Sequence, residues 1–230
     1  MPTTYPLVWD VTGEKRFETG NKKGVLFVME SDGTYNPGVA WNGLTAVSQS
    51  NSGADETALW ADDIKYASLR SAEEFGATIE AYQCPPEFYE CDGTAEIETG
   101  VYIGQQTRKH FGFSYVTTIG NDTLGNDYGY KIHLIYNASA NPSERSYQTI
   151  NESPDAITLS WELTTTPVPV RAPEGGSYTL SGTYKNVAHL EIDSTKVDRN
   201  KLDAFEAILY GSGSTAPRLP EPGEVAAMFA

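Results

Sequence analysis

The sequence predicts a mostly β protein: an antiparallel β-sandwich or barrel with one flanking helix near the C-terminus. Three observations predict it. Apolar residues alternate with polar ones over segments of strand length, most cleanly at Leu159, Trp161 and Leu163, which is the period of a strand with one buried face. Turn residues separate these segments. A helical spacing of apolar residues occurs only within residues 198–210, so the pattern favours a sandwich or barrel.

Four strands are expected in the first third of the chain. They span residues 24–30, 43–50, 57–69 and 75–82. The first is a continuous apolar run and the last alternates, the patterns of a fully buried and a half-buried strand. Asn42-Gly43 is a strong tight-turn signal. Residues 51–56 (NSGADE) are expected to be a flexible loop, and the third strand is expected to bend near Asp62-Asp63.

Three clear strands follow in the middle of the chain. They cover residues 109–117, 128–137 and 157–164. Before them, the Cys-Pro-Pro sequence at 84–86 ends the preceding strand because proline cannot donate to a ladder, and residues 86–91 are expected to form one helical turn. Residues 120–127 (GNDTLGND) are predicted to be a loop, and residues 175–193 a weaker strand pair.

The one expected helix spans residues 198–210. Asp198 is suited to cap it, Val197 and Leu202 to form a hydrophobic staple, and Gly211 to supply a left-handed stop. Its apolar stripe consists of Leu202, Phe205, Ile208 and Leu209. We therefore expect one β-sandwich domain over residues 24–211, with the helix at 198–210 included. An N-terminal arm (1–23) and a C-terminal arm (212–230) are expected beside it, each loose or docked elsewhere.

The charge is strongly acidic, with 16 Lys and Arg against 31 Asp and Glu and a net charge of −15. This balance argues against general attraction to nucleic acid or to anionic membranes, which need cationic side chains. Twelve acids lie between Asp55 and Glu98, opposed only by Lys65 and Arg70. No apolar run approaches the ~20 residues of a membrane span, and no secretory signal is expected at the N-terminus.

No catalytic or cofactor-binding motif stands out, so no enzymatic activity, metal or cofactor is expected. The histidines His110, His133 and His189 are far apart and lack motif partners, which favours surface or packing roles. Cys84 and Cys91 have no second Cys or His pair nearby, so a zinc site is not expected there. The loop at 120–127 lacks the spacing of a helix-loop-helix calcium site.

Several long sequence segments carry a family resemblance. They are NPGVAWNGLTAVSQSNSGADETALWADDIKYASLRSAEEFGATIEAY, IGQQTRKHFGFSY, GNDTLGNDYGYKIHLIYNA, SPDAITLSWELTTTPV and the closing KLDAFEAILYG and PRLPEPGEVAAMF. From about Gly24 to the C-terminus, the chain resembles the major tail tube protein of long-tailed, non-contractile bacteriophages and prophages. Cys84 and Pro85-Pro86 depart from that pattern.

The resemblance implies a virion protein, assembled in the bacterial cytoplasm, whose rings, usually hexameric, stack into a hollow tail through which DNA passes without specific binding. Tape-measure, tail-tip and tail-terminator proteins are its implied partners. Three sets of residues become candidates for assembly. Lumen-facing acids are Asp62, Asp63, Glu73 and Glu80; a ring-stacking loop is Gln49, Ser50, Asn51, Ser52, Gly53, Ala54, Asp55 and Glu56; arm anchors are Tyr5, Trp9, Phe17, Met228 and Phe229.

Two alternatives remain at the level of sequence. One is a carbohydrate-active or glycan-binding β-sandwich protein that uses the acidic face and exposed tryptophans; Trp9, Trp41, Trp60 and Trp161 are available, although Trp161 is expected in the core. The other is a different phage structural part, a tail terminator or a capsid decoration protein. The shape of the assembled polymer separates these from a tail tube.

Overall fold

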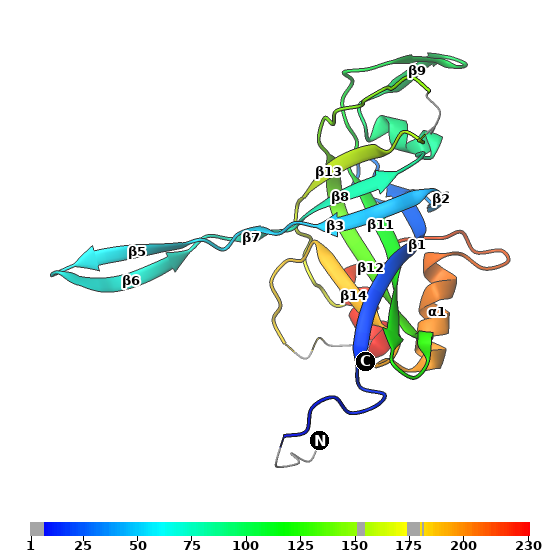
Figure 1. The fold of residues 1–230 in the computed structure, drawn as a ribbon. Coiled ribbons are helices and arrows are strands. Elements are labelled where there is room, and N and C mark those ends of the chain that lie inside the picture. The colour runs from blue at the N-terminus through cyan, green and yellow to red at the C-terminus, as the bar shows by residue number, and fades with distance from the viewer. Residues whose placement is uncertain (1–6, 151–154, 174–179, 181) are drawn as a thin grey trace.

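The computed structural model describes residues 7–150, 155–173, 180 and 182–230. A body built on one eight-stranded antiparallel sheet carries a thin projecting hairpin, the arm (residues 50–75) (Figure 1). The predicted mostly β, antiparallel class is confirmed. The strands of the sheet are β1 (Arg16–Val28), β2 (Val39–Trp41), β3 (Leu44–Gln49), β8 (Gly76–Ala81), β11 (Phe111–Asn121), β12 (Gly125–Ala140), β13 (Leu159–Thr165) and β14 (His189–Asp193).

The sheet follows the order β2-β1-β11-β12-β13-β8-β3 and branches at β12. The middle of this long strand pairs with β14 and its end pairs with β13. The sheet curves until β3 lies against β1, where a Cβ atom on Gly24 would be only 2.4 Å from Cδ1 of Leu44. The curved sheet therefore encloses an interior, and glycine at position 24 leaves room for the Leu44 side chain where β3 meets β1.

Two apolar cores lie on the two faces of the sheet because apolar residues occupy both faces of β1, β11 and β12. Inside the curve, the Trp41 ring lies 5.5 Å from that of Trp161 and 4.6 Å from that of Phe88, which comes from the short 3-10 helix η1 (Pro86–Glu90). Trp41 Nε1 donates a hydrogen bond to the Gln83 carbonyl (2.8 Å). This placement confirms the expected helical turn and the core position of Trp161.

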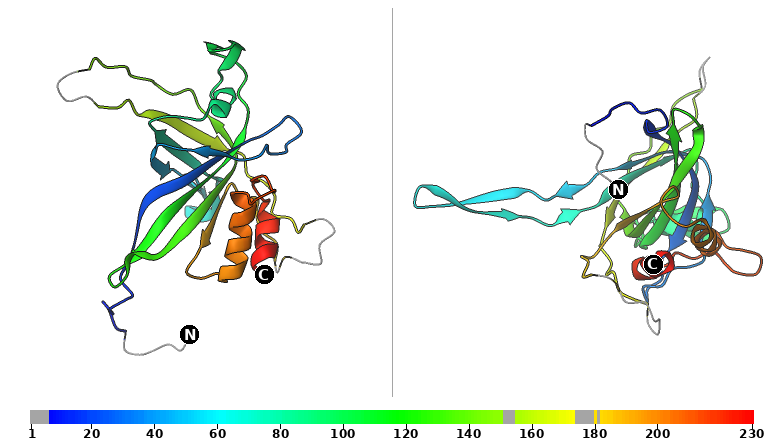
Figure 2. Two further views of the ribbon diagram at one scale, coloured as in Figure 1. Left: turned by 90° about the vertical axis from the view of Figure 1, so that its right-hand side faces the viewer. Right: turned by 90° about the horizontal axis from the view of Figure 1, so that it is seen from below.

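The second core lies between the outer face of the sheet and two helices, α1 (Arg199–Leu209) and α2 (Pro222–Phe229), which pack side by side (Figure 2). As predicted, the Asp198 carboxylate caps α1, accepting from the backbone N–H groups of Asn200 (3.0 Å) and Lys201 (3.1 Å). Gly211 takes the left-handed conformation, with a φ of 80°. Among the described residues, no helix is both long and apolar enough to span a membrane.

The arm departs from the sequence-based prediction. It is a hairpin of β5 (Glu56–Ala61) and β6 (Ile64–Arg70), extended at its root by β4 (Ser52–Gly53) and β7 (Glu73–Glu74). The predicted bent strand over 57–69 is wrong, because Asp62 and Asp63 both take positive φ (52° and 62°) and reverse the chain. The predicted flexible loop at 51–56 is wrong too, because β7 and β6 supply partners to its backbone.

The chain termini also differ from expectation. The predicted N-terminal arm 1–23 is too long, because β1 begins at Arg16 and pairs with Asn121 of β11; the polar sequence of this part hid a strand that is exposed on both faces. The C-terminal segment contains α2, which the sequence did not reveal. Its eight residues PGEVAAMF offered no long helical period, and it is packing on α1 that orders them.

Two further segments lie near their predicted positions. The loop predicted at 120–127 contracts to a turn between β11 and β12, in which the Asn121 side chain accepts from the N–H groups of Thr123 (3.2 Å) and Leu124 (2.6 Å). The strand pair predicted over 175–193 yields β14, while residues 174–179 and 181 lie outside the described part of the chain. A small hairpin of β9 (Ala95–Glu98) and β10 (Val101–Ile103) stands at the top of the body in the view of Figure 1.

Candidate functional site on the arm and at its root

The arm has one apolar face. Cross-strand pairing places Thr57 opposite Leu69 and Leu59 opposite Ala67, and side chains alternate between the faces of a strand. A register shift at residue 66 keeps this alternation in phase up to the turn. The apolar face consists of Thr57, Leu59, Ala61, Ile64, Ala67 and Leu69.

The opposite face of the arm carries Trp60 and a set of polar side chains that bond to one another. The Glu56 carboxylate accepts from Ser68 Oγ (2.6 Å) and forms ion pairs with Lys65 and with Arg70 (3.7 Å). These contacts lower the pKa of Glu56, through the hydrogen bond from Lys65 first and that from Ser68 second. The arm is therefore a two-sided ribbon, with its own polar groups bonded on one side and its aliphatic groups unpaired on the other.

The large apolar side chains of the arm face solvent because β5 and β6 extend away from the body (Figures 1 and 2). The exposed fractions are 41% for Leu59, 70% for Trp60, 62% for Ile64, 73% for Tyr66 and 58% for Leu69. Leu59, Ile64 and Leu69 lie on the apolar face and Trp60 on the opposite one. So many large exposed apolar side chains are unusual on a monomer and mark an interaction surface.

The four predicted lumen-facing acids do not gather at one place in the chain. Asp62 and Asp63 form the tip of the arm. Glu73 lies at its root, opposite Gly53, where its carboxylate accepts from Asn51 Nδ2 (2.9 Å). Glu80 is on β8 in the body. In one subunit these acids therefore span the whole arm and part of the sheet.

The predicted ring-stacking segment, residues 49–56, is the outgoing strand of the arm. Gln49 ends β3, and Ser50 exchanges backbone hydrogen bonds with Gly76, from Ser50 N–H to Gly76 O (2.8 Å) and from Gly76 N–H to Ser50 O (3.1 Å). This pair is the root of the arm. The segment thus projects from the body as a strand and not as a loop, and its role in ring stacking stays a prediction.

The residues predicted to anchor the N- and C-terminal segments fall into two groups. Trp9 is 75% exposed near the N-terminal end of the described chain, and Phe17 lies on β1, where its ring covers Gly120. Met228 and Phe229 lie on α2 and pack against the chain's own second core, with the Phe229 ring 5.7 Å from that of Phe205. Tyr5 lies outside the described residues.

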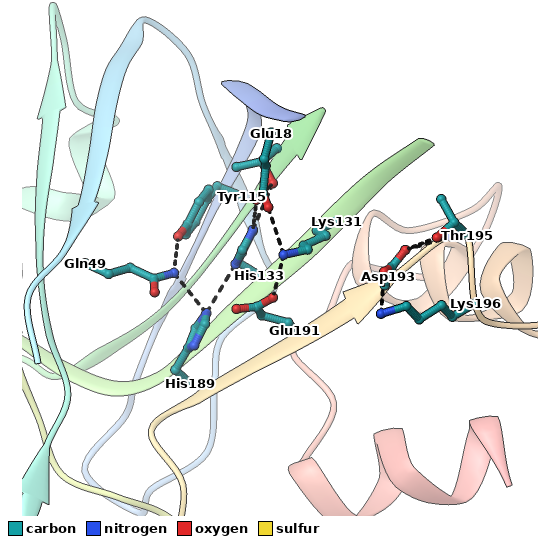
Figure 3. A network of polar contacts seen from close by, with 11 residues as sticks. Glu18, Gln49, Tyr115, Lys131, His133, His189, Glu191, Asp193, Thr195 and Lys196 are labelled. Atoms are coloured by element: carbon teal, nitrogen blue, oxygen red, sulfur yellow. Dashed lines mark hydrogen bonds and ion pairs between the residues drawn. The ribbon is translucent and has the colours of Figure 1, made fainter. Parts of the chain in front are cut away.

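A polar cluster, here called the root cluster, lies where the arm leaves the body (Figure 3). The inner face of β11 and β12 changes there from apolar to polar side chains. Its members are Glu18, Gln49, Tyr115, Thr117, Lys131, His133, His189 and Glu191. Sequence analysis missed it, because these residues come from five strands and only the pairing of β14 with β12 brings the two histidines together.

Two aromatic rings hold the histidines of the root cluster in place. The Tyr115 ring is parallel to that of His133 at 4.5 Å, and the Phe75 ring is parallel to that of His189 at 4.7 Å. His133 Nδ1 and His189 Nε2 lie 3.2 Å apart, whereas the ring centres are 5.5 Å apart. The two imidazoles therefore meet edge to edge, nitrogen to nitrogen.

Hydrogen bonds fix the surroundings of these rings. Gln49 Nε2 donates to the Tyr115 hydroxyl (2.8 Å) and lies 3.3 Å from His189 Nε2. On the other side of the pair, His133 Nε2 lies 3.0 Å from Thr117 Oγ1 and 3.5 Å from Glu18 Oε1. Gln49 therefore links the end of β3, next to the arm, to both ring systems.

The charges of the root cluster are unequal. Lys131 Nζ bridges the Glu18 (2.8 Å) and Glu191 (3.2 Å) carboxylates, so two acids face one lysine. Burial lowers the pKa of His189 to about 4 and also lowers the pKa of His133. Both imidazoles are therefore neutral near pH 7, with a lone pair on one nitrogen each.

The remaining candidates for chemistry lie apart from this cluster. Cys91 is buried and Cys84 half-buried, both as free thiols, and burial raises their pKa values to about 12 and about 11. His110 is exposed, and its Nδ1 lies 2.8 Å from Asn137 Oδ1. Trp41 and Trp161 are core residues, which leaves Trp9 and Trp60 as the exposed tryptophans.

Comparison with known proteins adds no family assignment. Neither the protein-family models nor the curated proteins give a match to this chain.

Proposed function

We propose that this chain is a structural subunit that assembles with copies of itself into the tail tube of a long-tailed, non-contractile bacteriophage. The observation that carries the proposal is the apolar face of the arm, exposed on a hairpin that stands clear of its own body. The resemblance of the sequence to major tail tube proteins supplies the type of assembly: stacked rings around a channel for DNA.

A second copy is the occupant that suits this face best. Burying apolar surface contributes roughly 25 cal/mol per Å², and the outer edges of β5 and β6 offer unpaired backbone groups that another strand can bind. An isolated two-stranded hairpin is marginally stable in water, so docking would also order the arm. A ring gives every arm the same partner surface, because cyclic symmetry repeats one head-to-tail contact.

The charge of the chain suits a channel for DNA. A net charge of −15 opposes the retention of a polyanion that must pass through. The arm carries part of that charge into the assembly through the tip residues Asp62 and Asp63 and the root residue Glu73. Tape-measure, tail-tip and tail-terminator proteins are the further partners that this function requires.

Electron microscopy of the concentrated protein, alone and with its tail-tip proteins, tests the proposal. We expect hollow tubes of stacked rings from the wild type. The double variant Leu59→Ser, Leu69→Ser should stay monomeric, because it removes two of the three large aliphatic side chains of the apolar face and leaves only Ile64. The matched variant Ala58→Ser, Ser68→Ala changes the same two strands on the opposite face and should form tubes.

An arm-shortened variant makes the test independent of single side chains. Replacing residues 54–72 with Asn-Gly joins Gly53 to Glu73, which are partners in the β4–β7 ladder, and keeps Phe75 against His189. This variant should fold and stay monomeric. Two results would refute the proposal: tubes formed without the arm, or a wild type that stays monomeric with every tail-tip protein added. Single rings would identify a tail terminator, and shell binding a decoration protein.

A further inference from the structure

We propose that His133, His189 and Glu191 form a binding site for one divalent transition-metal ion, with zinc as the metal that fits best. The inference does not depend on the proposed tube function. It rests on where the ligand atoms lie, on what holds the two imidazoles, and on the charge around them.

The distances suit one ion. One ligand atom from each of the three residues lies within 4.8 Å of the other two. His133 Nδ1 and His189 Nε2 are 3.2 Å apart, and two nitrogens bound tetrahedrally to zinc at about 2.0–2.1 Å lie roughly 3.3 Å apart. The observed separation of the two nitrogens therefore already matches that of two nitrogens bound to one ion.

The surroundings of His133 are those of a metal-bound histidine. Such histidines use the second ring nitrogen to bond a carboxylate or another oxygen, which fixes the tautomer and the ring orientation. His133 has Nε2 at 3.0 Å from Thr117 Oγ1 and 3.5 Å from Glu18 Oε1, and these groups leave Nδ1 directed at His189. Tyr115 and Phe75 pack on the flat faces of the two rings and restrict their other motions.

Charge and access favour a cation at this position. Within the part of the chain that the structure describes, Lys131 is the one lysine or arginine that pairs with Glu18 and Glu191, so a negative charge remains for a bound cation to offset. His133 is 3% exposed, but His189 is half-buried and Glu191 is exposed, which gives an ion a path from solvent. Gln49 Nε2 gives up its contact with His189 when that nitrogen binds the ion, and keeps its bond to Tyr115.

The ligand set selects the class of metal. Two imidazoles and one carboxylate suit Zn²⁺, Co²⁺, Ni²⁺ or Cu²⁺, whereas Mg²⁺ and Ca²⁺ prefer oxygen ligands throughout. Three protein ligands leave a fourth position for water or for a group from outside the chain. A bound ion would tie β14 to β12 beside the root of the arm.

Calorimetric titration of the chelator-treated full chain with ZnCl₂ tests the site. We expect one Zn²⁺ per chain, bound at least about tenfold more weakly by His189→Ala and by Glu191→Gln. His110→Ala is the control, because that histidine lies outside the root cluster and should bind Zn²⁺ like the wild type. Circular dichroism of each variant checks that the fold is retained. The buried His133 is left unchanged, because its substitution could disturb the fold itself.

Two further measurements give independent outcomes. Co²⁺ should produce visible absorption typical of nitrogen and oxygen ligands in the wild type and lose it in His189→Ala. Zn²⁺ should raise the melting temperature of the wild type and not of His189→Ala. Wild-type protein that binds no stoichiometric Zn²⁺, or equal affinities in wild type, His189→Ala and Glu191→Gln, would overturn the site.

Discussion

The arm and the body use the same residue types in opposite ways. Trp161 is fully buried in the body, between Trp41 and Phe88, whereas Trp60 on the arm is 70% exposed. In the body, β11 and β12 have neighbours on both edges and cores on both faces; in the arm, β5 and β6 have only each other.

If the proposed function holds, this difference separates folding from assembly. The body holds the apolar contacts that stabilise the fold, whereas the large apolar side chains of the arm stay exposed. A change in the arm should therefore alter assembly with little effect on the free energy of unfolding, and a change in the body should do the reverse.

The largest difference is expected in amide hydrogen exchange of the monomer. Amides of β11 and β12 should exchange only through global unfolding, and those of β5 and β6 through local opening, so that the arm exchanges at least about 1,000-fold faster. Mass spectrometry with peptide resolution measures both at once. Equal protection in the two regions would show that the arm is stabilised by contacts with the body.

The two tryptophans give the next largest contrast. Trp161→Ala should lower the free energy of unfolding by about 3–5 kcal/mol, because it leaves a cavity between the rings of the inner core. Trp60→Ala should change it by less than about 0.5 kcal/mol. Urea unfolding followed by circular dichroism checks both values. A comparable loss in the two variants would contradict the separation of the arm from the folding unit.

Two tyrosines provide a smaller contrast. The Tyr136 hydroxyl, buried beneath α2, donates to the Pro220 carbonyl (3.0 Å). Tyr136→Phe should therefore cost about 1 kcal/mol, the usual contribution of one such hydrogen bond. Tyr66→Phe on the arm should cost nothing measurable, because Tyr66 is 73% exposed. Thermal melts of the two variants, recorded under one set of conditions, provide the comparison; an unchanged melting temperature for Tyr136→Phe would mean that this bond does not hold α2.

The tip of the arm should show the smallest effect. Replacing Asp62-Asp63 with Asn-Gly puts the preferred residues at two positive-φ positions and should stabilise the hairpin by about 0.5 kcal/mol. Exchange of the β5 and β6 amides should slow about twofold, while the melting temperature of the body stays the same. Ala-Ala at these positions is the control and should speed exchange. A shift in the melting temperature of the body would again link the two regions.

The sequence by itself determined the elements whose signals are local. Alternation over 109–117, 128–137 and 157–164 predicted β11, β12 and β13, since period-two burial is visible in one strand alone. Asp198 and Gly211 marked the ends of α1 because capping involves only neighbouring residues.

The tertiary structure alone decided which strands are neighbours and which side chains from different strands meet. Alternation tells which side chains of a strand face inward, but not which strand lies beside it. His133 and His189 are 56 residues apart, and they meet because β14 pairs with the middle of β12. The direction of the arm was equally hidden, since two left-handed residues, Asp62 and Asp63, turn one expected strand into a projecting hairpin.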